Sequence, residues 1–209
     1  MYSKKEGEFC DYGFNLIVGE QGTGKTITLV YLLLKYQEQY PLLKVRTNMC
    51  YKYENGGIEN WRDLVFSNNG EYGQIDVLDE VQNWFSSLQS KNFPVEMLSE
   101  ISQQRKQRKM ILGTSQVWQR VAKPIREQVR LVYKPFTLFG CLTICTVYKP
   151  IVNSDGQTES MKFRKVFYFV HNDKIRHAFD TYKKIQYMSA VGFKEQPPLT
   201  NNNAPQFTQ

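Results

Sequence analysis

The sequence predicts an α/β protein, and three observations lead to that prediction. Residues 19–26 read GEQGTGKT, which matches the phosphate-binding pattern G-x-x-x-x-G-K-[ST] without a gap. A short apolar run at 14–18 precedes this loop and is typical of a buried strand, while the longer apolar run at 27–36 is typical of a helix. Further short apolar runs then alternate with polar and helical segments, as in folds that combine strands with helices.

The strand, loop and helix together form the setting that phosphate binding requires. Glycines let the backbone wrap around phosphate oxygens, successive N–H groups point inward, and the helix N-terminus adds partial positive charge. Lys25 is expected to reach the β- and γ-phosphates of a nucleotide, and the Thr26 hydroxyl to help coordinate Mg²⁺. The alternative is a glycine-rich turn that matches by chance, which the flanking strand and helix disfavour. The expected nucleotide-binding residues are Gly19, Glu20, Gln21, Gly22, Thr23, Gly24, Lys25 and Thr26.

Length and charge favour a single soluble domain with an anionic partner. A chain of 209 residues can enclose one substantial core, with or without an appendage. A net charge of +7 and a pI near 9.1 indicate an anion such as nucleic acid as that partner. The cysteines have no C-x-x-C spacing and no histidine at ligand distance in sequence, which indicates reduced thiols of a cytosolic protein rather than a metal site. They are Cys10, Cys50, Cys141 and Cys145.

Neither a secretory signal nor a membrane helix is expected. Residues 1–9 are polar and charged, unlike a signal peptide. The most apolar later run, residues 136–147, holds about a dozen residues between two Lys-Pro pairs, whereas a membrane-spanning helix needs about 20.

An acidic pair ends the third expected strand. Residues 74–78 read as that strand, and Asp79 and Glu80 follow it directly. In phosphate-loop enzymes such an acid, here Asp79, holds Mg²⁺, and an adjacent glutamate, here Glu80, can orient and polarise the attacking water. The alternative is a solvated strand end. The pair favours nucleotide hydrolysis over phosphate transfer to a small molecule. Between Pro41 and this strand, the sequence predicts a strand, a loop, a short helix and a turn at 43–49, 51–57, 61–67 and 68–70.

A basic cluster ends the next expected helix. Pro94 is suited to open this helix, and Val95, Leu98 and Ile101 follow a helical rhythm. Its far end reads RKQRK at 105–109. Cations favour a helix C-terminus and solvate well, which is one interpretation. The other is that an arginine reaches the γ-phosphate of a neighbouring subunit, or that the cluster contacts a DNA backbone.

Residues 110–113 are the fourth expected strand, and polar residues 114–116 follow it. Gln116 at such a strand end is suited to sense the γ-phosphate, and the alternative is a simple cap. Pro124 divides residues 117–128 into two short helical pieces, and residues 130–133 read as a fifth strand. From 101 to 136 there are nine basic residues and one acid, Glu127. This bias suggests a surface that faces a polyanion or another subunit, and a solvated basic face is the alternative.

The remaining chain predicts a hairpin and a tail. Residues 142–152 and 161–170 flank the turn-forming sequence NSDG at 153–156. Strand alternation places Met161, Phe163, Phe167 and Phe169 on one face, and Lys162 and Arg164 on the other. Most of this hairpin reads as core packing, with a DNA contact as the alternative role for the two cations. His171 and His177 read as surface residues, and residues 194–209 read as a disordered tail.

In five segments the chain resembles the FtsK and HerA superfamily of P-loop ATPases. These are GEQGTGKT, VLDEVQNWF, QQRKQRK, MILGTSQVWQ and PIREQVRLV, within residues 14–133. The likeness is nearest to the zonula occludens toxin-like (Zot-like) assembly proteins of filamentous phages and to the genome-packaging ATPases of small viruses. Its specific part is the combination of Asp79-Glu80, Gln116 and Ile125-Arg126.

The resemblance implies a RecA-like core with strand order 5-1-4-3-2, and ATP hydrolysis with Mg²⁺ in a ring, with six subunits as the expected number. The resemblance implies catalytic roles for Lys25, Glu80 and Gln116, and it implies that Thr26 and Asp79 hold the metal. The candidate arginine fingers are Arg105, Arg108, Arg120 and Arg126, and the candidate DNA contacts are Lys106, Lys109, Lys123, Lys162 and Arg164.

The expected domain is residues 1–193, with a core at 14–136, a hairpin extension at 137–171 and a helical piece at 172–193. The leading functional hypothesis is a DNA-translocating ATPase that packages a viral genome, with capsid proteins as further partners, in the host cytoplasm or the virion. Zot-like proteins carry a membrane span after the ATPase domain, and its absence here favours this hypothesis. The alternatives are a Zot-like ATPase for phage assembly with a separate membrane partner and, less favoured, a nucleotide or metabolite kinase.

Overall fold

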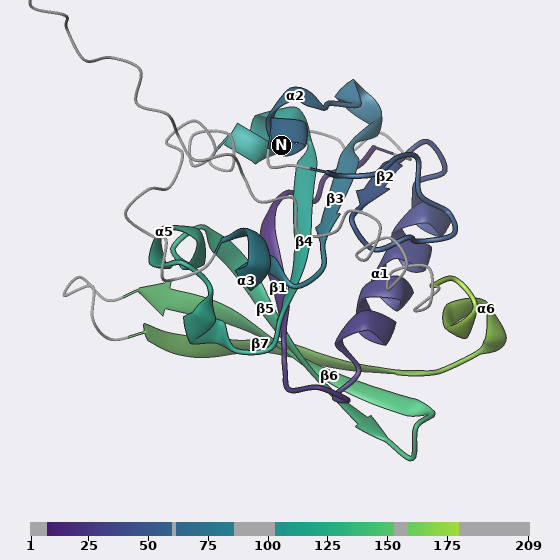
Figure 1. Ribbon diagram of the computed structural model, residues 1–209, viewed down its shortest axis with the longest axis vertical. Coiled ribbons are helices and arrows are strands. Elements are labelled where there is room, and N and C mark those ends of the chain that lie inside the picture. The colour runs from purple at the N-terminus through teal and green to yellow at the C-terminus, as the bar shows by residue number, and fades with distance from the viewer. Residues whose placement is uncertain (1–7, 60–61, 86–102, 153–158, 180–209) are drawn as a thin grey trace, which may run out of the picture.

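A seven-stranded sheet organises the described residues of the computed structural model (Figure 1), which are 8–59, 62–85, 103–152 and 159–179. Its strands are β1 (Gly13–Val18), β2 (Lys44–Thr47), β3 (Gln74–Leu78), β4 (Lys109–Ser115), β5 (Val129–Leu138), β6 (Leu142–Val152) and β7 (Glu159–Val170). They lie in the order β2-β3-β4-β1-β5-β6-β7. The first five pair in parallel, and β6 and β7 are antiparallel additions. The expected RecA-like core order, 5-1-4-3-2, and the hairpin extension are therefore confirmed.

Within the described residues the helices lie in segments that the sequence predicts to be helical, except for one short helix at 81–84 that it does not predict. They are α1 (Lys25–Gln39), α2 (Arg62–Phe66), α3 (Val81–Trp84), α5 (Lys123–Arg126) and α6 (Asp173–Arg176), with 3₁₀ turns η1 (Gly70–Tyr72) and η3 (Trp118–Arg120). Residues 103–107 are also helical. Pro124 lies in the first turn of α5, where a proline is tolerated because no intrahelical N–H bond is lost. The expected start of the basic helix at Pro94 lies outside the described residues.

Both faces of the parallel strands are buried. Strands β3 and β4 are buried along their whole length, including their polar residues Gln74, Asp76 and Lys109. One face packs against α1 through a cluster that includes Ile17, Leu29 and Leu33. The other face packs against α3, η3 and α5 through a cluster that includes Phe14 and Trp118. This arrangement brings the loop after β1 and the residues after β3 and β4 to one edge of the sheet.

Strand β5 is longer than the sequence indicates and joins the core to the extension. It continues through Pro135 to Leu138, then turns at residues 139–141 into β6. Proline has no N–H to donate, so it is tolerated where one side of a strand has no partner. The pairing of β5 with β1 ends at Tyr133, two residues earlier. The expected boundary between core and hairpin at 136 and 137 therefore falls within a single strand.

One prediction about the hairpin is wrong. Phe167 and Phe169 pack with the α1-side cluster, whereas Met161 packs with the cluster on the opposite face. The reason is a β-bulge: Val147 pairs with Lys165 but Tyr148 pairs with Phe163, which leaves Arg164 as an extra residue. An extra residue shifts the alternation by one, so the two halves of β7 present their aromatic side chains to different faces.

The chain after β7 returns to the α1 side of the sheet. Figure 1 shows α6 beside α1, and Tyr51 forms an antiparallel bridge with Phe179. The expected turn at 153–156 and tail at 194–209 lie outside the described residues. In the part of the chain that the structure describes, no helix is both long enough and apolar enough to span a membrane.

Candidate nucleotide site

The loop GEQGTGKT lies between the end of β1 and the start of α1, as predicted. Its first residue is tied to the neighbouring strand, because the N–H of Gly19 donates a 3.2 Å hydrogen bond to the Ser115 carbonyl at the end of β4. Gly24 has a φ of +95°, a left-handed conformation that side chains disfavour. A Cβ at Gly24 would lie only 2.2 Å from Thr137 Oγ1, so this position requires glycine for a second reason.

Lys25 lies against the loop itself. Its ammonium donates a 3.0 Å hydrogen bond to the Glu20 carbonyl, and the Thr23 hydroxyl donates a 2.8 Å bond to the same oxygen. Lys25 is 9% exposed, so most of its side chain is fixed by packing. A phosphate oxygen is a stronger acceptor for an ammonium than a neutral carbonyl. An anion that enters the loop is therefore expected to draw the Lys25 ammonium away from the Glu20 carbonyl.

Asp79 is held rigidly directly after β3. Its backbone N–H donates a 2.7 Å hydrogen bond to Asn48 Oδ1, and its carbonyl accepts a 3.2 Å bond from Asn48 Nδ2. The Thr114 hydroxyl donates a 2.5 Å bond to Asp79 Oδ1. The Asp79 backbone is thereby fixed by the residue that follows β2, and the Asp79 carboxylate is fixed by a residue of β4.

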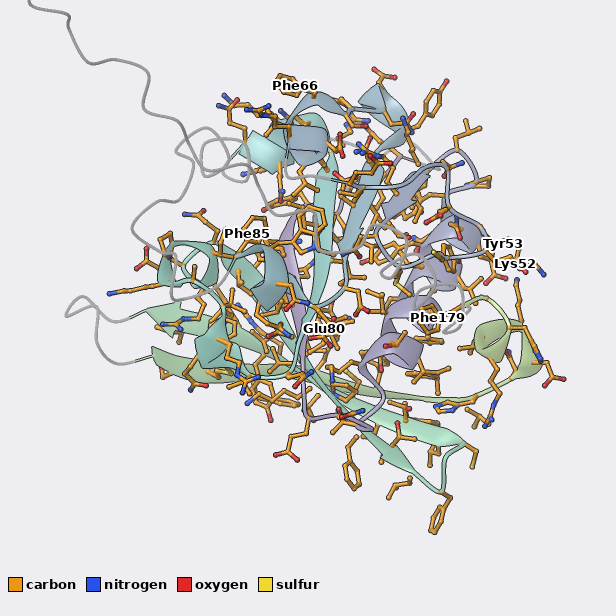
Figure 2. All side chains as sticks on the ribbon, in the orientation of Figure 1. Lys52, Tyr53, Phe66, Glu80, Phe85 and Phe179 are labelled. Atoms are coloured by element: carbon orange, nitrogen blue, oxygen red, sulfur yellow. The ribbon has the colours of Figure 1, made fainter. Side chains whose placement is uncertain are left out.

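Glu80 adopts a conformation that fixes its direction. Its φ of 56° and ψ of 58° are left-handed values that are uncommon for a residue with a side chain. The Glu80 N–H donates a 2.9 Å bond to Thr114 Oγ1, and the Gln82 side-chain amide donates to the Glu80 carboxylate. Figure 2 labels Glu80 where β3 ends, at the edge of the sheet that carries the loop. Strained backbone of this kind is often found at functional sites.

The strand order brings the predicted site residues to one place. Strand β4 lies between β3 and β1, so Thr114 contacts the Asp79-Glu80 pair while Ser115 contacts the loop. Gln116 follows Ser115 directly and is partly exposed. Two oxygen donors suited to Mg²⁺ are present, the Thr26 hydroxyl and the Asp79 carboxylate. Among the described residues no three His, Cys, Asp or Glu side chains gather as a metal site. This donor set fits an ion that is completed by phosphate and water rather than by protein.

No family model matches the sequence, and no curated protein matches it. The structure is similar to the N-terminal domain of zonular occludens toxin from Neisseria meningitidis, with a TM-score of 0.57 and 15% identity over 80% of this chain and 98% of that one. The two chains share a fold. The genome packaging NTPase B204 from Sulfolobus turreted icosahedral virus 2, in complex with ATP-gammaS, is also similar, with a TM-score of 0.47 and 10% identity over 72% of this chain and 96% of that chain. The flagellar accessory protein FlaH from Methanocaldococcus jannaschii has a TM-score of 0.45 and 13% identity, over 75% and 84% of the two chains.

The four candidate arginine fingers lie at different places on the fold. Arg105 and Arg108 precede β4 and so lie at the sheet edge opposite the loop, where Arg105 stacks over Tyr12 and Arg108 pairs with Glu8. Arg120 follows β4 in η3 and is exposed. Arg126 donates hydrogen bonds to the carbonyls of residues 119 and 121, so its guanidinium serves local structure. Which of them faces a neighbouring subunit stays a prediction.

Four of the five candidate DNA contacts are exposed, and the fifth requires a correction. The exposed ones are Lys106, Lys123, Lys162 and Arg164. Lys109 is 1% exposed; its ammonium lies 3.4 Å from the buried Asp76 carboxylate and also donates to the carbonyls of Leu64 and Ser67. A DNA backbone cannot reach an ammonium enclosed in this way. The prediction for Lys109 is therefore wrong, because the residue begins a buried strand instead of ending a solvated helix.

Sequence reasoning missed two residues that position the acids. Asn48 and Thr114 hold Asp79 and Glu80, yet neither was assigned a role. Each is a polar residue at the end of a buried parallel strand, the same signal that identified Asp79. Applied to every strand of the sheet, that signal would have found both.

Proposed function

We propose that this chain is an ATP-hydrolysing motor that translocates DNA, and that it packages a viral genome. One observation carries the hydrolytic part of the proposal. Thr114 bonds both Asp79 and Glu80, and the next residue, Ser115, bonds the first residue of the phosphate loop. A phosphate-binding loop and a strand-end acidic pair are thus coupled through a single strand, and phosphate-loop hydrolysis uses these two parts together.

The proposed mechanism assigns a step to each residue. Lys25 leaves the Glu20 carbonyl and donates to the β- and γ-phosphate oxygens of ATP, where its charge offsets the developing negative charge. Thr26 and Asp79 would hold Mg²⁺, which would supply positive charge to offset the negative charge of the phosphates. Glu80 orients a water and accepts its proton as the water oxygen attacks the γ-phosphorus. The bond from that phosphorus to the bridging oxygen breaks, giving ADP and inorganic phosphate. Gln116 would respond to loss of the γ-phosphate.

Basic side chains support DNA as the cargo. Lys106, Lys123, Lys162 and Arg164 are exposed and come from separate segments of the fold. Exposed cations bind the phosphate backbone without reading its sequence, which suits a motor that must move along any sequence. A ring of subunits would enclose DNA and supply an arginine from a neighbour, and Arg120 is the exposed candidate on the segment that follows β4.

DNA is expected to stimulate ATP hydrolysis by the purified protein. The stimulation should decline steeply between about 50 and 200 mM salt, because phosphate contacts release counterions on binding. Phosphate release is measured with and without duplex and single-stranded DNA across this salt range. A combined replacement of Lys162 and Arg164 by alanine should weaken the salt-sensitive part and leave basal hydrolysis unchanged. Hydrolysis without DNA binding at the lowest salt would contradict the cargo assignment and leave the ATPase assignment standing.

A second candidate is an ATPase that drives phage assembly with a separate membrane protein and does not grip DNA. It is favoured by an apolar face on the extension. Cross-strand neighbours Phe136, Ile144 and Tyr168 lie on the side away from α1, and Phe136 and Tyr168 are 60% and 74% exposed. Large exposed apolar side chains on one face are typical of protein contact sites. Recovery of a stable complex with a membrane protein, together with salt-insensitive ATP hydrolysis, would favour this candidate over the first.

Replacement of Thr114 by valine is expected to lower kcat/KM for ATP about tenfold or more. The substitution keeps the side-chain shape but removes the hydroxyl that donates to Asp79 and accepts from Glu80. Removing one hydrogen-bond partner from such buried groups costs about 1–3 kcal/mol, and about 1.4 kcal/mol corresponds to a factor of ten. Steady-state phosphate release measures the effect. Thr114→Ser, which keeps the hydroxyl, should retain most of the activity, and equal activity of the valine variant and the wild type would count against this role.

A further inference from the structure

A row of polar side chains connects the phosphate loop to the antiparallel extension. The Thr137 hydroxyl on β5 donates a 3.2 Å hydrogen bond to the Thr23 carbonyl in the loop. Thr137 Oγ1 lies 2.7 Å from Thr143 Oγ1 on β6, which in turn lies 2.7 Å from Nε2 of His171, directly after β7. Strands β5 and β6 and the residue after β7 thus each contribute one member to a chain that ends at the loop. None of these residues belongs to the motif that defines the nucleotide site.

The number of protons fixes the direction of this chain. A threonine hydroxyl has one proton to donate. Because Thr137 donates its proton to the Thr23 carbonyl, Thr143 must donate to Thr137. Thr143 then has no proton left for His171, so Nε2 of His171 carries a proton and donates to Thr143. Thr143 is fully buried, so water does not substitute readily for the two bonds that its hydroxyl makes.

The extension also packs directly against the loop. Thr137 Oγ1 occupies the space into which a Cβ of Gly24 would project, at 2.2 Å. The loop and β5 are therefore in direct contact, and any shift of the Thr23-Gly24 peptide moves it against Thr137. This contact joins residues 114 positions apart in the sequence, so it is a property of the fold and not of the local motif.

We propose that Thr137 is a positioning residue for nucleotide binding, which acts through the peptide between Thr23 and Gly24 and is itself held by Thr143 and His171. The proposal rests on the proposed function of the loop. In a planar trans peptide the C=O and N–H point in opposite directions. Holding the Thr23 carbonyl toward Thr137 therefore turns the Gly24 N–H away from β5. The anion-binding property of such loops depends on inward-pointing N–H groups, so a loop held in this way loses less freedom when phosphate binds.

Thr137→Val removes the hydroxyl at nearly constant shape and is the direct test. Binding of the non-hydrolysable analogue AMP-PNP with Mg²⁺ is measured by calorimetry, and ATP hydrolysis is measured in parallel. We expect the analogue to bind about five- to tenfold more weakly, which corresponds to the loss of one hydrogen bond. The change should appear mainly in KM, because Thr137 does not touch the reacting atoms. Thr137→Ser keeps the hydroxyl and should restore binding to near the wild-type affinity.

Two further variants keep the test decisive. Thr146→Val is the matched control, since the Thr146 hydroxyl on β6 donates to the Lys134 carbonyl instead of to the row, and this variant should bind the analogue like the wild type. His171→Ala removes the far end of the row and should weaken binding in the same direction by a smaller factor, even where Thr137→Val does not fold. Wild-type affinity in both Thr137→Val and His171→Ala would overturn the role of Thr137 but would leave the proposed function standing. A wild-type protein that does not bind the analogue would instead overturn the proposed function on which it rests.

Discussion

Glu80→Gln is expected to reduce ATP turnover by about 100-fold to 10,000-fold, the usual contribution of a general base, while ATP still binds. Glutamine has nearly the same shape but cannot accept a proton from water. The backbone contact from the Glu80 N–H to Thr114 does not involve the side chain, and the glutamine carbonyl can still accept from Gln82. The loop that binds the phosphates is therefore expected to be unchanged. Single-turnover hydrolysis and AMP-PNP affinity are the two measurements.

Two comparisons identify the step that Glu80 serves. Lys25→Ala removes the ammonium that the loop positions, so it should lose nucleotide affinity as well as turnover. Glu127→Gln changes an exposed glutamate at the end of α5, and both its turnover and its affinity should match the wild type. If Glu80→Gln hydrolyses ATP at the wild-type rate, the base is a different residue and the proposed mechanism fails. Loss of binding in Glu80→Gln would instead assign Glu80 a structural role.

The parts of the site that the sequence predicts are those in which chemistry and spacing are local. The loop at 19–26 carries its glycines, lysine and threonine in one contiguous run, and the strand and helix around it follow from the adjacent apolar runs. The signal for Asp79 and Glu80 is equally local, because the two acids directly follow a short buried strand. The residues of that strand at 75, 77 and 78 are apolar and lie in the core. The core strand order follows from resemblance rather than from any single segment.

The parts that the sequence does not predict depend on register or on distant contacts. Thr137 reaches the loop only because β5 runs on past the end of its pairing with β1 and turns back as β6. The bulge at Arg164 reverses which face the end of β7 presents, and nothing in the alternation of residues 161–169 announces it. The basic residues of the run at 105–109 cannot be told apart from the sequence, yet Lys106 is exposed and Lys109 is buried three positions later. The two lysines differ in burial because β4 begins at Lys109.

Lys109→Met is expected to lower the free energy of unfolding by about 3–5 kcal/mol, the usual cost of removing one partner from a buried ion pair. Asp76 and Lys109 are both almost fully buried, with 3.4 Å between the Asp76 carboxylate and the Lys109 ammonium. Lys109 also donates to the carbonyls of Leu64 and Ser67, so it fastens α2 and the residues after it to the sheet. Methionine fills much the same volume and supplies none of these bonds. Urea unfolding followed by tryptophan fluorescence measures the loss.

Two comparison variants distinguish the loss of the buried Asp76–Lys109 pair from the loss of one positive charge. Lys106→Met removes an exposed cation from the same basic run and should leave stability unchanged. The double variant Lys109→Met, Asp76→Leu replaces the whole pair with apolar side chains and should regain much of the lost stability, since buried pairs are often replaceable in this way. Unchanged stability of Lys109→Met would mean that Asp76 and the carbonyls of Leu64 and Ser67 find other partners.

The stability lost in Lys109→Met should also depend on pH. The direction of that dependence identifies the Asp76 carboxylate as the source of the loss. Burial raises the pKa of Asp76 above its ordinary value of 3.8, and the charges of Lys109 and Arg46 oppose that rise. Without Lys109 the pKa of Asp76 should rise further. An acid with a raised folded-state pKa is tolerated below its unfolded pKa, near pH 4, and destabilises the fold as pH increases through the folded value. Lys109→Met should therefore be closest to the wild type in acid and fall furthest below it at pH 8. A loss that is the same at every pH would point to the bonds at Leu64 and Ser67 instead.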